Sequence, residues 1–346
     1  MSTINDVAKL ARVSISTVSN VLNGRTDRMS KDTFARVEKA VTELGYQPNR
    51  AARQLKTGEA ALIGLLVPSL TNPSYGALAR EIEAEAWESY GYRVVVSNTY
   101  RDPRNERAFL DDMLTHGIRG VIIISSLADE SHIEEVVRKG LVAISYDSQS
   151  QRAIQPVIDH VSSDNVAGGR MAAEYLIANG HRCIAFLTPR GWTFSRAQKR
   201  EGFMLAVEAA GIRGVVIEGA LSSNYADEEL AELGMSLAGT VAEHPERPTG
   251  IVAINDIMAV GLLAGLRKRG MAIPADVSVV GMDGIALGTF VAPPLTSVRL
   301  ATRDMAKAMV DRIMLRLKRG ETTPSTFRFP PTMLVRESVA GPPLRR

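Results

Sequence analysis

The chain has 346 residues, of which 45% are hydrophobic, 23% are charged and 5% are aromatic. The composition is ordinary for a globular protein with a sizeable core, and the length indicates two or three domains. The single cysteine, Cys183, excludes an intrachain disulfide, and the apolar runs are shorter than the roughly 20 residues of a membrane span. The first residues do not resemble a signal peptide, so we expect a cytoplasmic protein with no membrane partner.

The net charge of +3 is distributed unevenly along the chain. The first 58 residues hold ten Lys or Arg and five Asp or Glu side chains, whereas the other 288 residues hold 31 basic and 33 acidic ones. A small basic segment joined to a nearly neutral body favours contact with a polyanion through that segment. Exposed helix faces are often basic, so charge alone does not decide whether this segment binds a polyanion.

Residues 3–23 have the spacing of two short helices joined by a tight turn. Apolar residues recur at helical intervals in both halves: Ile4, Val7, Leu10 and Ala11, then Val18, Val21 and Leu22. Ser14 is placed to accept a hydrogen bond from a first-turn amide and so to cap the second helix. A third helix is predicted between a cap at Ser30 and a stop at Gly45. This pattern favours a helix-turn-helix.

In a helix-turn-helix the second helix enters the major groove, and its exposed first residues reach the bases. Asn20 can pair with an adenine edge, Ser16 can bond to several bases, and Ile15 can touch a thymine methyl. Four short hydrogen-bonding residues suit contacts to DNA phosphates, namely Ser14, Thr17, Ser19 and Asn23. Helical spacing alone leaves a plain helical hairpin with a polar outer face as an equal alternative.

A short basic segment follows the three predicted helices. It contains Asn49, Arg50, Ala52, Arg53 and Leu55. Pro48 disfavours helix at Gln47, and the segment that follows can form about two turns of helix, too few to be stable alone in water. We predict that residues 49–58 are a linker that becomes helical only on a partner.

From residue 60 onward, apolar strands alternate with helices. The expected strands are residues 62–67, 93–97, 120–124, 141–146, 157–160, 183–187, 215–218, 250–254 and 277–282, and the expected helices include residues 77–90, 105–116, 165–179, 197–210 and 256–269. Such alternation predicts an α/β fold with doubly wound parallel sheets. The pattern breaks near residues 156–163 and restarts, so we expect two subdomains with a ligand in the cleft between them.

Short motifs along nearly the whole chain follow one family pattern. They are TINDVA at 3–8, VS at 13–14, TVS at 17–19, VLN at 21–23, LGYQPN at 44–49, RQL at 53–55 and IGLLVP at 63–68, then SDN at 163–165, GH at 180–181, EGF at 201–203, ND at 255–256, GMD at 281–283, PLTSV at 294–298 and LVRES at 334–338. Together they resemble the LacI/GalR family of bacterial transcriptional regulators.

The resemblance implies a homodimer whose two heads bind a palindromic operator in successive major grooves. The hinge helices then lie in the minor groove, where Leu55 matches a leucine that pries open a base step; from the residues alone, Leu55 is better explained as a packing residue. The implied domains are a helix-turn-helix DNA-binding domain at 1–48, a hinge at 49–58 and an effector-binding core at 59–346. No leucine heptad follows the last strand, which favours a dimer over a tetramer.

The resemblance also implies a core like that of periplasmic sugar-binding proteins. Its N-subdomain is expected at about 60–157 and 293–321, and its C-subdomain at about 158–290 and 325–340. The implied effector is a sugar or sugar-acid-like molecule. The positions that match effector-binding residues of the family are Asn72, Tyr75, Asp147, Lys199, Asp256 and Asp283.

Some of these positions carry an alternative or depart from the family. On sequence alone, Asp256 is better explained as a helix cap than as a ligand contact. Lys199 stands where the family often has a ligand-clamping Arg, and a Lys cannot form the two-pronged guanidinium bond. Leu221 stands where some members place an aromatic lid, for which Trp192 or Phe194 could substitute.

Enzyme hypotheses lack their motifs. The sequence contains no GxGxxG, Walker-type, HExxH or GxSxG motif, and the five histidines lack metal-ligand spacing, so we expect no catalytic residue, cofactor or metal. The leading hypothesis is a sequence-specific DNA-binding transcriptional regulator, expected to be a repressor, whose operator affinity is controlled by a small molecule in the cleft between the subdomains. The alternatives are a solute-binding protein of a transport system and an enzyme with a DNA-binding head.

Overall fold

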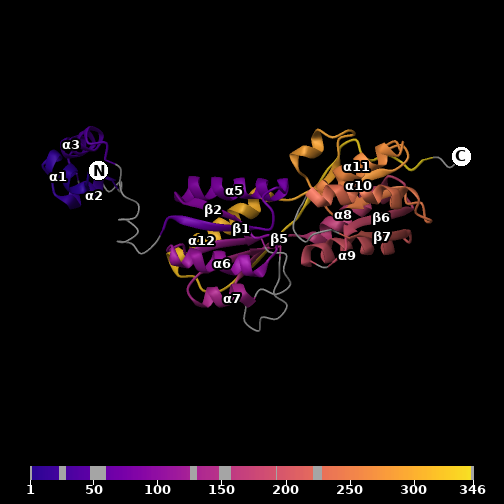
Figure 1. Cartoon of the computed structure of the whole chain (residues 1–346), viewed down its shortest axis with the longest axis horizontal. Helices are drawn as coiled ribbons and strands as arrows, with labels where there is room; N and C mark the ends of the chain where they lie inside the picture. Colours follow the sequence, from indigo (N-terminus) through magenta and orange to yellow (C-terminus); the bar gives the residue numbers. More distant parts are fainter. Residues whose placement is uncertain are drawn as a thin grey trace. The chain divides into compact units, whose positions relative to one another are not determined.

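The computed structural model describes residues 2–22, 29–46, 60–124, 131–147, 157–191, 193–220 and 228–343. The chain divides into two compact units, Met1–Ala60 and Ala61–Arg346, which we call the head and the core (Figure 1). Several residues singled out above lie outside the described residues, namely Asn23, Asn49, Arg50, Ala52, Arg53, Leu55, Trp192 and Leu221.

The helices described in the head are α1 (Ile4–Ala11), α2 (Ile15–Leu22) and α3 (Lys31–Glu43). Each begins after a hydroxyl residue, Thr3, Ser14 or Ser30, whose side chain accepts a hydrogen bond from the backbone N–H three residues later. The predicted caps at Ser14 and Ser30 are therefore confirmed. The turn between α1 and α2 is made at Arg12, which has a left-handed backbone with φ of 54°.

The three helices enclose a small apolar core. Val7, Val18 and Val37, one from each helix, have no exposed surface. Leu10, which shares the apolar spacing of α1, lies outside this core, because 45% of its surface is exposed. The buried stripe of α1 passes through Val7 and Ala11, and at 3.6 residues per turn Leu10 points to one side of that stripe.

The described residues of the core form two sheets. The strands are β1 (Leu62–Val67), β2 (Arg93–Asn98), β3 (Gly120–Ile124), β4 (Val142–Tyr146), β5 (Asp159–Ser163), β6 (Cys183–Pro189), β7 (Arg213–Gly219), β8 (Gly250–Ala253), β9 (Ser278–Asp283), β10 (Thr296–Arg299), β11 (Thr326–Phe329) and β12 (Thr332–Leu334). The first sheet has the order β11-β5-β4-β3-β1-β2 and the second β12-β10-β9-β8-β6-β7. Neighbouring strands run parallel, apart from the antiparallel β10–β12 pair.

Helices cover both faces of each sheet, which confirms the predicted doubly wound α/β fold. They are α5 (Pro73–Tyr90), α6 (Pro103–Thr115), α7 (Ser131–Arg138), α8 (Asn165–Ala178), α9 (Phe194–Ala209), α10 (Glu228–Ala242), α11 (Asp256–Lys268) and α12 (Thr302–Arg319), with a 3-10 turn, η1 (Ala286–Thr289). We call the first sheet with its helices the first subdomain, and the second sheet with its helices the second subdomain.

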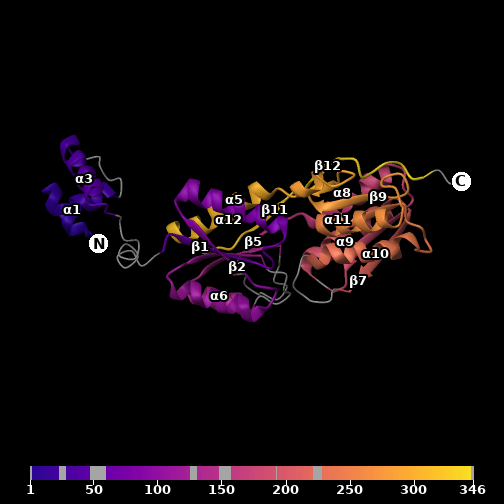
Figure 2. The same cartoon turned by 45° about the horizontal axis from the view of Figure 1, so that its top comes forward.

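Strand β1 explains why the first sheet is covered on both sides. Ile63 and Leu65 pack into the cluster with α5 and α12, whereas Leu66 packs into the cluster with α6 and α7. Successive side chains of a strand point to opposite faces, so an apolar run without polar alternation needs a helical layer on each face. Figure 2 shows α5 and α12 on one side of the first sheet and α6 on the other.

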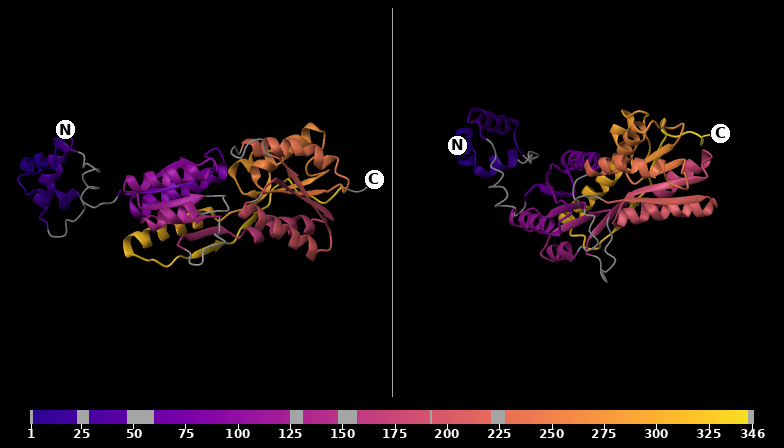
Figure 3. Two further views of the ribbon diagram at one scale, coloured as in Figure 1. Left: turned by 60° about the horizontal axis from the view of Figure 1, so that its bottom comes forward. Right: turned by 45° about the vertical axis from the view of Figure 1, so that its right-hand side comes forward.

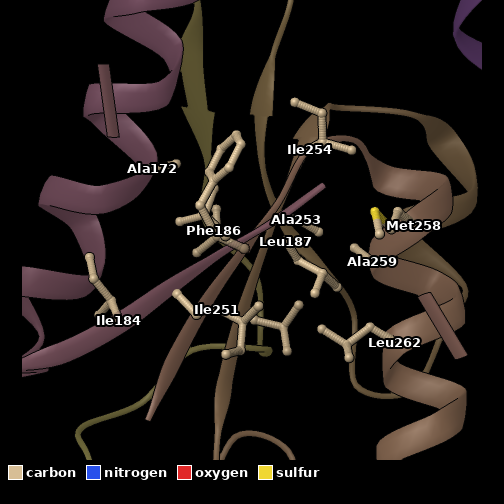
Figure 4. Close-up of a cluster of buried hydrophobic side chains, with 14 of the residues drawn as sticks. Ala172, Ile184, Phe186, Leu187, Ile251, Ala253, Ile254, Met258, Ala259 and Leu262 are labelled. Carbon is tan, nitrogen blue, oxygen red and sulfur yellow. The ribbon is translucent and has the colours of Figure 1, made fainter. Parts of the chain in front are cut away.

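The second sheet follows the same rule. Ala172 of α8 lies on one side of strand residues Phe186 and Ile251, while Met258 and Leu262 of α11 lie on the opposite side (Figure 4). All five side chains are buried in one apolar cluster. Helix α9 packs on α8, and α10 packs on α11.

The crossings between the sheets lie later in the chain than predicted. Strand β5 still belongs to the first sheet, so the first crossing follows Ser163. Residues 293–321 were expected in the N-subdomain, but β10 pairs with β9 in the second sheet. Residues 325–340 were expected in the C-subdomain, but β11 pairs with β5 in the first sheet. Short strands that include exposed positions, as β10 and β11 do, carry too little apolar periodicity to be predicted from sequence. Helix α12 lies between β10 and β11 in the chain and returns to the first sheet, as its late-sequence colour among earlier elements shows (Figure 3).

A buried ionic network holds α12 against β5. The two carboxylate oxygens of Asp159 accept hydrogen bonds from Nε of Arg312 and Nη1 of Arg316, each at 2.6 Å, and Oδ1 also accepts the Ser325 N–H at 2.8 Å. Asp159 has no exposed surface, so the loss of its partners would leave a buried charge uncompensated. The network connects β5, α12 and the residue before β11, and both β5 and β11 lie next to crossings between the subdomains.

Candidate functional site

The outer face of α2 carries the three residues predicted to contact bases. Ile15 is 49% exposed, and Ser16 and Asn20 are also exposed. The apolar side chain of Ile15 is not part of the apolar core of the head. The structure thus places Ile15, Ser16 and Asn20 at the surface of one helix.

Three of the four residues predicted to contact phosphates, Ser14, Thr17 and Ser19, lie at the start and side of the same helix. The Ser14 hydroxyl accepts the Thr17 N–H at 3.1 Å and shares hydrogen bonds with the hydroxyls of Ser16 at 2.7 Å and Thr17 at 2.8 Å. Ser14 is exposed, whereas Thr17 and Ser19 are half-buried. These bonds connect the side chains and backbone of the first turn of α2.

A polar cavity of about 90 Å³ lies between the two sheets of the core. From the first subdomain it is lined near the ends of β3 and β4 and the start of α5, and from the second near the starts of α8, α9 and α11 and the end of β9. This is the position at which open parallel sheets bind ligands. Five of the six predicted effector residues line it, namely Asn72, Tyr75, Asp147, Lys199 and Asp283.

Asp147 enters the cavity from the end of β4. Its backbone is left-handed, with φ of 57°, and its N–H donates to the Val161 carbonyl oxygen at 3.0 Å. Its Oδ1 accepts a hydrogen bond from Nδ2 of Asn165 at 2.6 Å. Burial raises the pKa of Asp147, against the opposing effects of the Lys199 charge and of hydrogen bonds from Asn165 and Ser195.

Lys199 and Asp283 form an ion pair on the opposite wall. Nζ of Lys199 lies 3.7 Å from Oδ1 of Asp283 and donates to the Ile254 carbonyl oxygen at 3.3 Å. Asp283 has a φ of 127°, a conformation that side chains rarely adopt. Strained backbone of this kind persists where the surroundings impose it, and it is frequent at ligand sites.

Asp256 does not line the cavity. It has no exposed surface, and its carboxylate accepts hydrogen bonds from Oγ of Ser297 at 2.5 Å and from the Ile285 N–H at 2.7 Å. Burial raises its pKa, while those hydrogen bonds lower it. The neighbouring residue Asn255 lines the cavity and also caps α11 by accepting the Met258 N–H at 2.9 Å. Asn255 is therefore the cap of α11, and of the two neighbouring residues it is the one that lines the cavity.

The cavity is also lined by residues that were not among the predicted effector-binding positions. They include Arg101, Tyr146, Asn165, Ser195, Arg196 and Asn255. Arg196 precedes Lys199 by three residues on α9, a spacing that places two side chains on one helix face, so helical periodicity could have found it. Phe194 begins α9 but does not line the cavity.

The electrostatics of the cavity suit a hydroxyl-rich ligand. Its lining includes three basic side chains, Arg101, Arg196 and Lys199, and two carboxylates, Asp147 and Asp283. Such a mixture of donors and acceptors can bind hydroxyl groups in both directions and tolerates one negative charge. Among the described residues no cluster of His, Cys, Asp or Glu is arranged to hold a metal ion, and none of their helices is long and apolar enough to cross a membrane.

Comparison with known proteins agrees with both units of the structure. Residues 3–49 match the lacI family of bacterial regulatory proteins, and residues 173–339 match a periplasmic binding protein-like domain. The chain is 33% identical over 342 residues to the ribose operon repressor of Halalkalibacterium halodurans, which covers 99% of this chain and 98% of that protein.

Two solved structures extend the comparison. The Lac repressor dimer bound to operator and the anti-inducer ONPF has a TM-score of 0.82 and 27% identity, covering 98% of this chain and 99% of that one. A LacI family transcriptional regulator from Enterococcus faecium with bound ribose has a TM-score of 0.70 and 26% identity, covering 82% and 100%. By its sequence and its fold, the chain belongs to the lacI family of bacterial regulatory proteins.

Proposed function

We propose that the protein is a transcriptional repressor whose affinity for operator DNA is controlled by a small molecule in the core cavity. The observation that carries this proposal is the presence, in one chain, of a head with an exposed polar recognition helix and a core with a polar cavity between two sheets. Residues 1–48 bind DNA, residues 49–58 form the hinge, and residues 59–346 bind the effector. The solute-binding alternative leaves the head without a role.

The DNA side of the proposal rests on α2. Ile15, Ser16 and Asn20 contact base edges, and the hydroxyl groups at its start contact phosphates. Two copies of the chain bind a palindromic site, in the manner of the Lac repressor dimer on its operator. A protein with this target acts in the cytoplasm.

The effector side of the proposal rests on the cavity. Its basic and acidic lining favours a sugar or a sugar acid, and the relatives named for ribose support a carbohydrate. A volume of about 90 Å³ is small beside the roughly 300–1,000 Å³ of typical ligand pockets, which favours a compact ligand. Because the cavity lies between the subdomains, its occupant shifts their angle and so the hinge segment, which couples ligand and DNA affinities reciprocally.

The proposed function is tested by in vitro selection from random-sequence DNA with the full chain. We expect enrichment of a palindrome with two half-sites. In parallel, a thermal-shift screen over sugars, sugar acids, polyols and purines should find a ligand that raises the melting temperature of the core. Recovery of no preferred DNA sequence would refute the repressor function.

Asn20→Ala should weaken binding to the selected palindrome by roughly tenfold or more and relax preference at one base of each half-site. A bidentate contact to a base contributes about 1–3 kcal/mol of discrimination. Fluorescence anisotropy with wild-type and single-base variant DNA measures both effects. Asn5→Ala, an exposed asparagine on α1, is the matched control and should change neither. An unchanged preference in the Asn20 variant would remove this residue from the interface.

Asp283→Asn should weaken binding of the ligand found in the screen by roughly tenfold or more, while affinity for DNA without that ligand stays the same. The change keeps the size of the side chain but removes the charge that faces Lys199 and the cavity. Calorimetry gives the ligand affinity. Asp276→Asn, on an exposed loop of the same subdomain, is the control and should behave like wild type. Equal ligand affinity in the Asp283 variant and wild type would place the effector elsewhere.

A further inference from the structure

Helices α8 and α9 of the second subdomain touch backbone to backbone. A side chain at Gly169 would lie 1.9 Å from the Lys199 carbonyl oxygen, and one at Gly202 would lie 1.9 Å from the Val166 carbonyl oxygen. Only glycine permits so close an approach at these two positions. Side chains at the starts of the two helices are therefore held in fixed positions relative to each other.

Asn165 begins α8 at the point where the chain first crosses between the subdomains. The preceding residue, Asp164, donates its N–H to the Phe329 carbonyl oxygen at 2.8 Å, and its carboxylate caps α8 by accepting the Ala167 N–H at 2.9 Å. Phe329 ends β11 in the first sheet. Asn165 is only 3% exposed, and it directly follows the residue whose backbone is hydrogen-bonded to the first sheet.

Asn165 reaches across the cleft to the first subdomain. Its Nδ2 donates to Oδ1 of Asp147 at 2.6 Å and lies 3.4 Å from Oε1 of Gln198. Ser195 of α9 also hydrogen-bonds the Asp147 carboxylate. Asp147 itself is fixed to the first sheet through its backbone bond to Val161. One carboxylate of the first subdomain is thus bonded to both helices of the α8–α9 pair.

We propose that Asn165 is a positioning residue that ties Asp147 to the α8–α9 pair and holds the two subdomains closed over the cavity. Opening the cleft breaks a short hydrogen bond to a carboxylate, a class stronger than bonds between neutral groups. An effector hydroxyl that bonds to Asp147 competes for the oxygen that Asn165 occupies. The competition with an effector rests on the proposed function, whereas the hydrogen bond between Asn165 and Asp147, which we call the tie, does not.

The tie is tested in the full chain without effector or DNA by electron-spin distance measurement. Glu88→Cys on α5 and Glu208→Cys on α9, both exposed, carry one spin label on each subdomain, with Cys183→Ser removing the native thiol. Labelled chains are diluted into excess unlabelled chains so that distances within one chain dominate. Because the inter-label distance reports opening directly, failure of this test leaves the proposed function untouched.

We expect one narrow distance in the wild-type sequence and a second, longer distance in Asn165→Ala, with the open population raised about tenfold. Asn179→Ala is the matched control at the other end of α8, where the amide donates to the Tyr175 carbonyl oxygen at 2.8 Å, and it should leave the distribution unchanged. Coincident distributions for wild type and Asn165→Ala, or equal opening in the control, would overturn the proposal.

Asn165→Asp adds a readout that a purely structural role would not move. It keeps the side-chain size, so it also carries the test if the alanine variant does not fold. At neutral pH two carboxylates then face each other and the cleft should open; at acid pH they can share a proton, and the cleft should close again. The other ionisable groups lining the cavity are Tyr75, Arg101, Tyr146, Arg196, Lys199 and Asp283. These groups are the same in Asn165→Ala and Asn165→Asp, so a pH response found only in Asn165→Asp comes from the new carboxylate. An inter-label distance in Asn165→Asp that does not change with pH would contradict the tie.

Discussion

Asp256→Ala is expected to lower the free energy of unfolding of the core by about 3 kcal/mol. The wild-type carboxylate, which has no exposed surface, accepts hydrogen bonds from the Ser297 hydroxyl and the Ile285 N–H. Alanine leaves these buried donors without an acceptor, and each unsatisfied donor costs roughly 1–3 kcal/mol. Part of this cost is offset because the substitution also removes a buried carboxylate, whose ionised form is disfavoured by burial, as its raised pKa indicates. Urea denaturation followed by far-UV circular dichroism measures the loss.

Two further variants make this expectation specific. Asp256→Asn keeps the shape and one acceptor oxygen, and should cost less than alanine. Asp112→Ala, an exposed acid on α6, should change stability by no more than about 0.5 kcal/mol. If Asp256→Ala unfolded like wild type and instead lost effector affinity, Asp256 would contact the ligand directly, as the family resemblance alone implies.

Leu55→Ala is expected to weaken binding to the selected palindrome roughly a hundredfold and to leave non-specific DNA binding unchanged. An apolar wedge acts by unstacking a base step, which matters only where the bent site forms its full set of contacts. Because no charge is removed, the salt dependence of non-specific binding should also be preserved. Anisotropy titrations with the palindrome and with scrambled DNA separate the two quantities.

The matched control for Leu55 is Leu205→Ala, which truncates a leucine that is 46% exposed on α9. It should bind both DNAs like wild type. Equal losses of specific and non-specific affinity in Leu55→Ala would mean that the leucine supports the fold of the linker and does not act as a wedge.

The long, doubly buried strands could be predicted from sequence because their apolar runs have no other explanation. The bounds of β1 and β3 agree with the prediction, since β1 and β3 each face helices on both sides. Strands β10, β11 and β12 could not be predicted, because each is four residues or shorter and includes exposed positions. Their pairing depends on neighbours that are distant in sequence. The points at which the chain crosses between the subdomains depend on this pairing and so could not be predicted either.

The cavity was predictable where a polar residue ends a buried strand, as Asp147 and Asp283 do. Asn255 and Asp256 mark the limit of that rule. Both follow β8 and both suit a helix cap, and only the tertiary packing of Ser297 and Ile285 draws Asp256 inward and leaves Asn255 at the cavity. Asn165 lies in a motif that the family resemblance marked, but its bond to Asp147 joins two subdomains and has no signature in local sequence.

The central claim is that one molecule in the cavity changes affinity for one DNA sequence. The most direct test measures the dissociation constant of the full chain for the selected palindrome, with and without a saturating concentration of the ligand found by thermal shift. We predict a change of about tenfold or more, with the DNA changing ligand affinity by the same factor, as linkage requires. The same dissociation constant with and without the ligand would contradict the account.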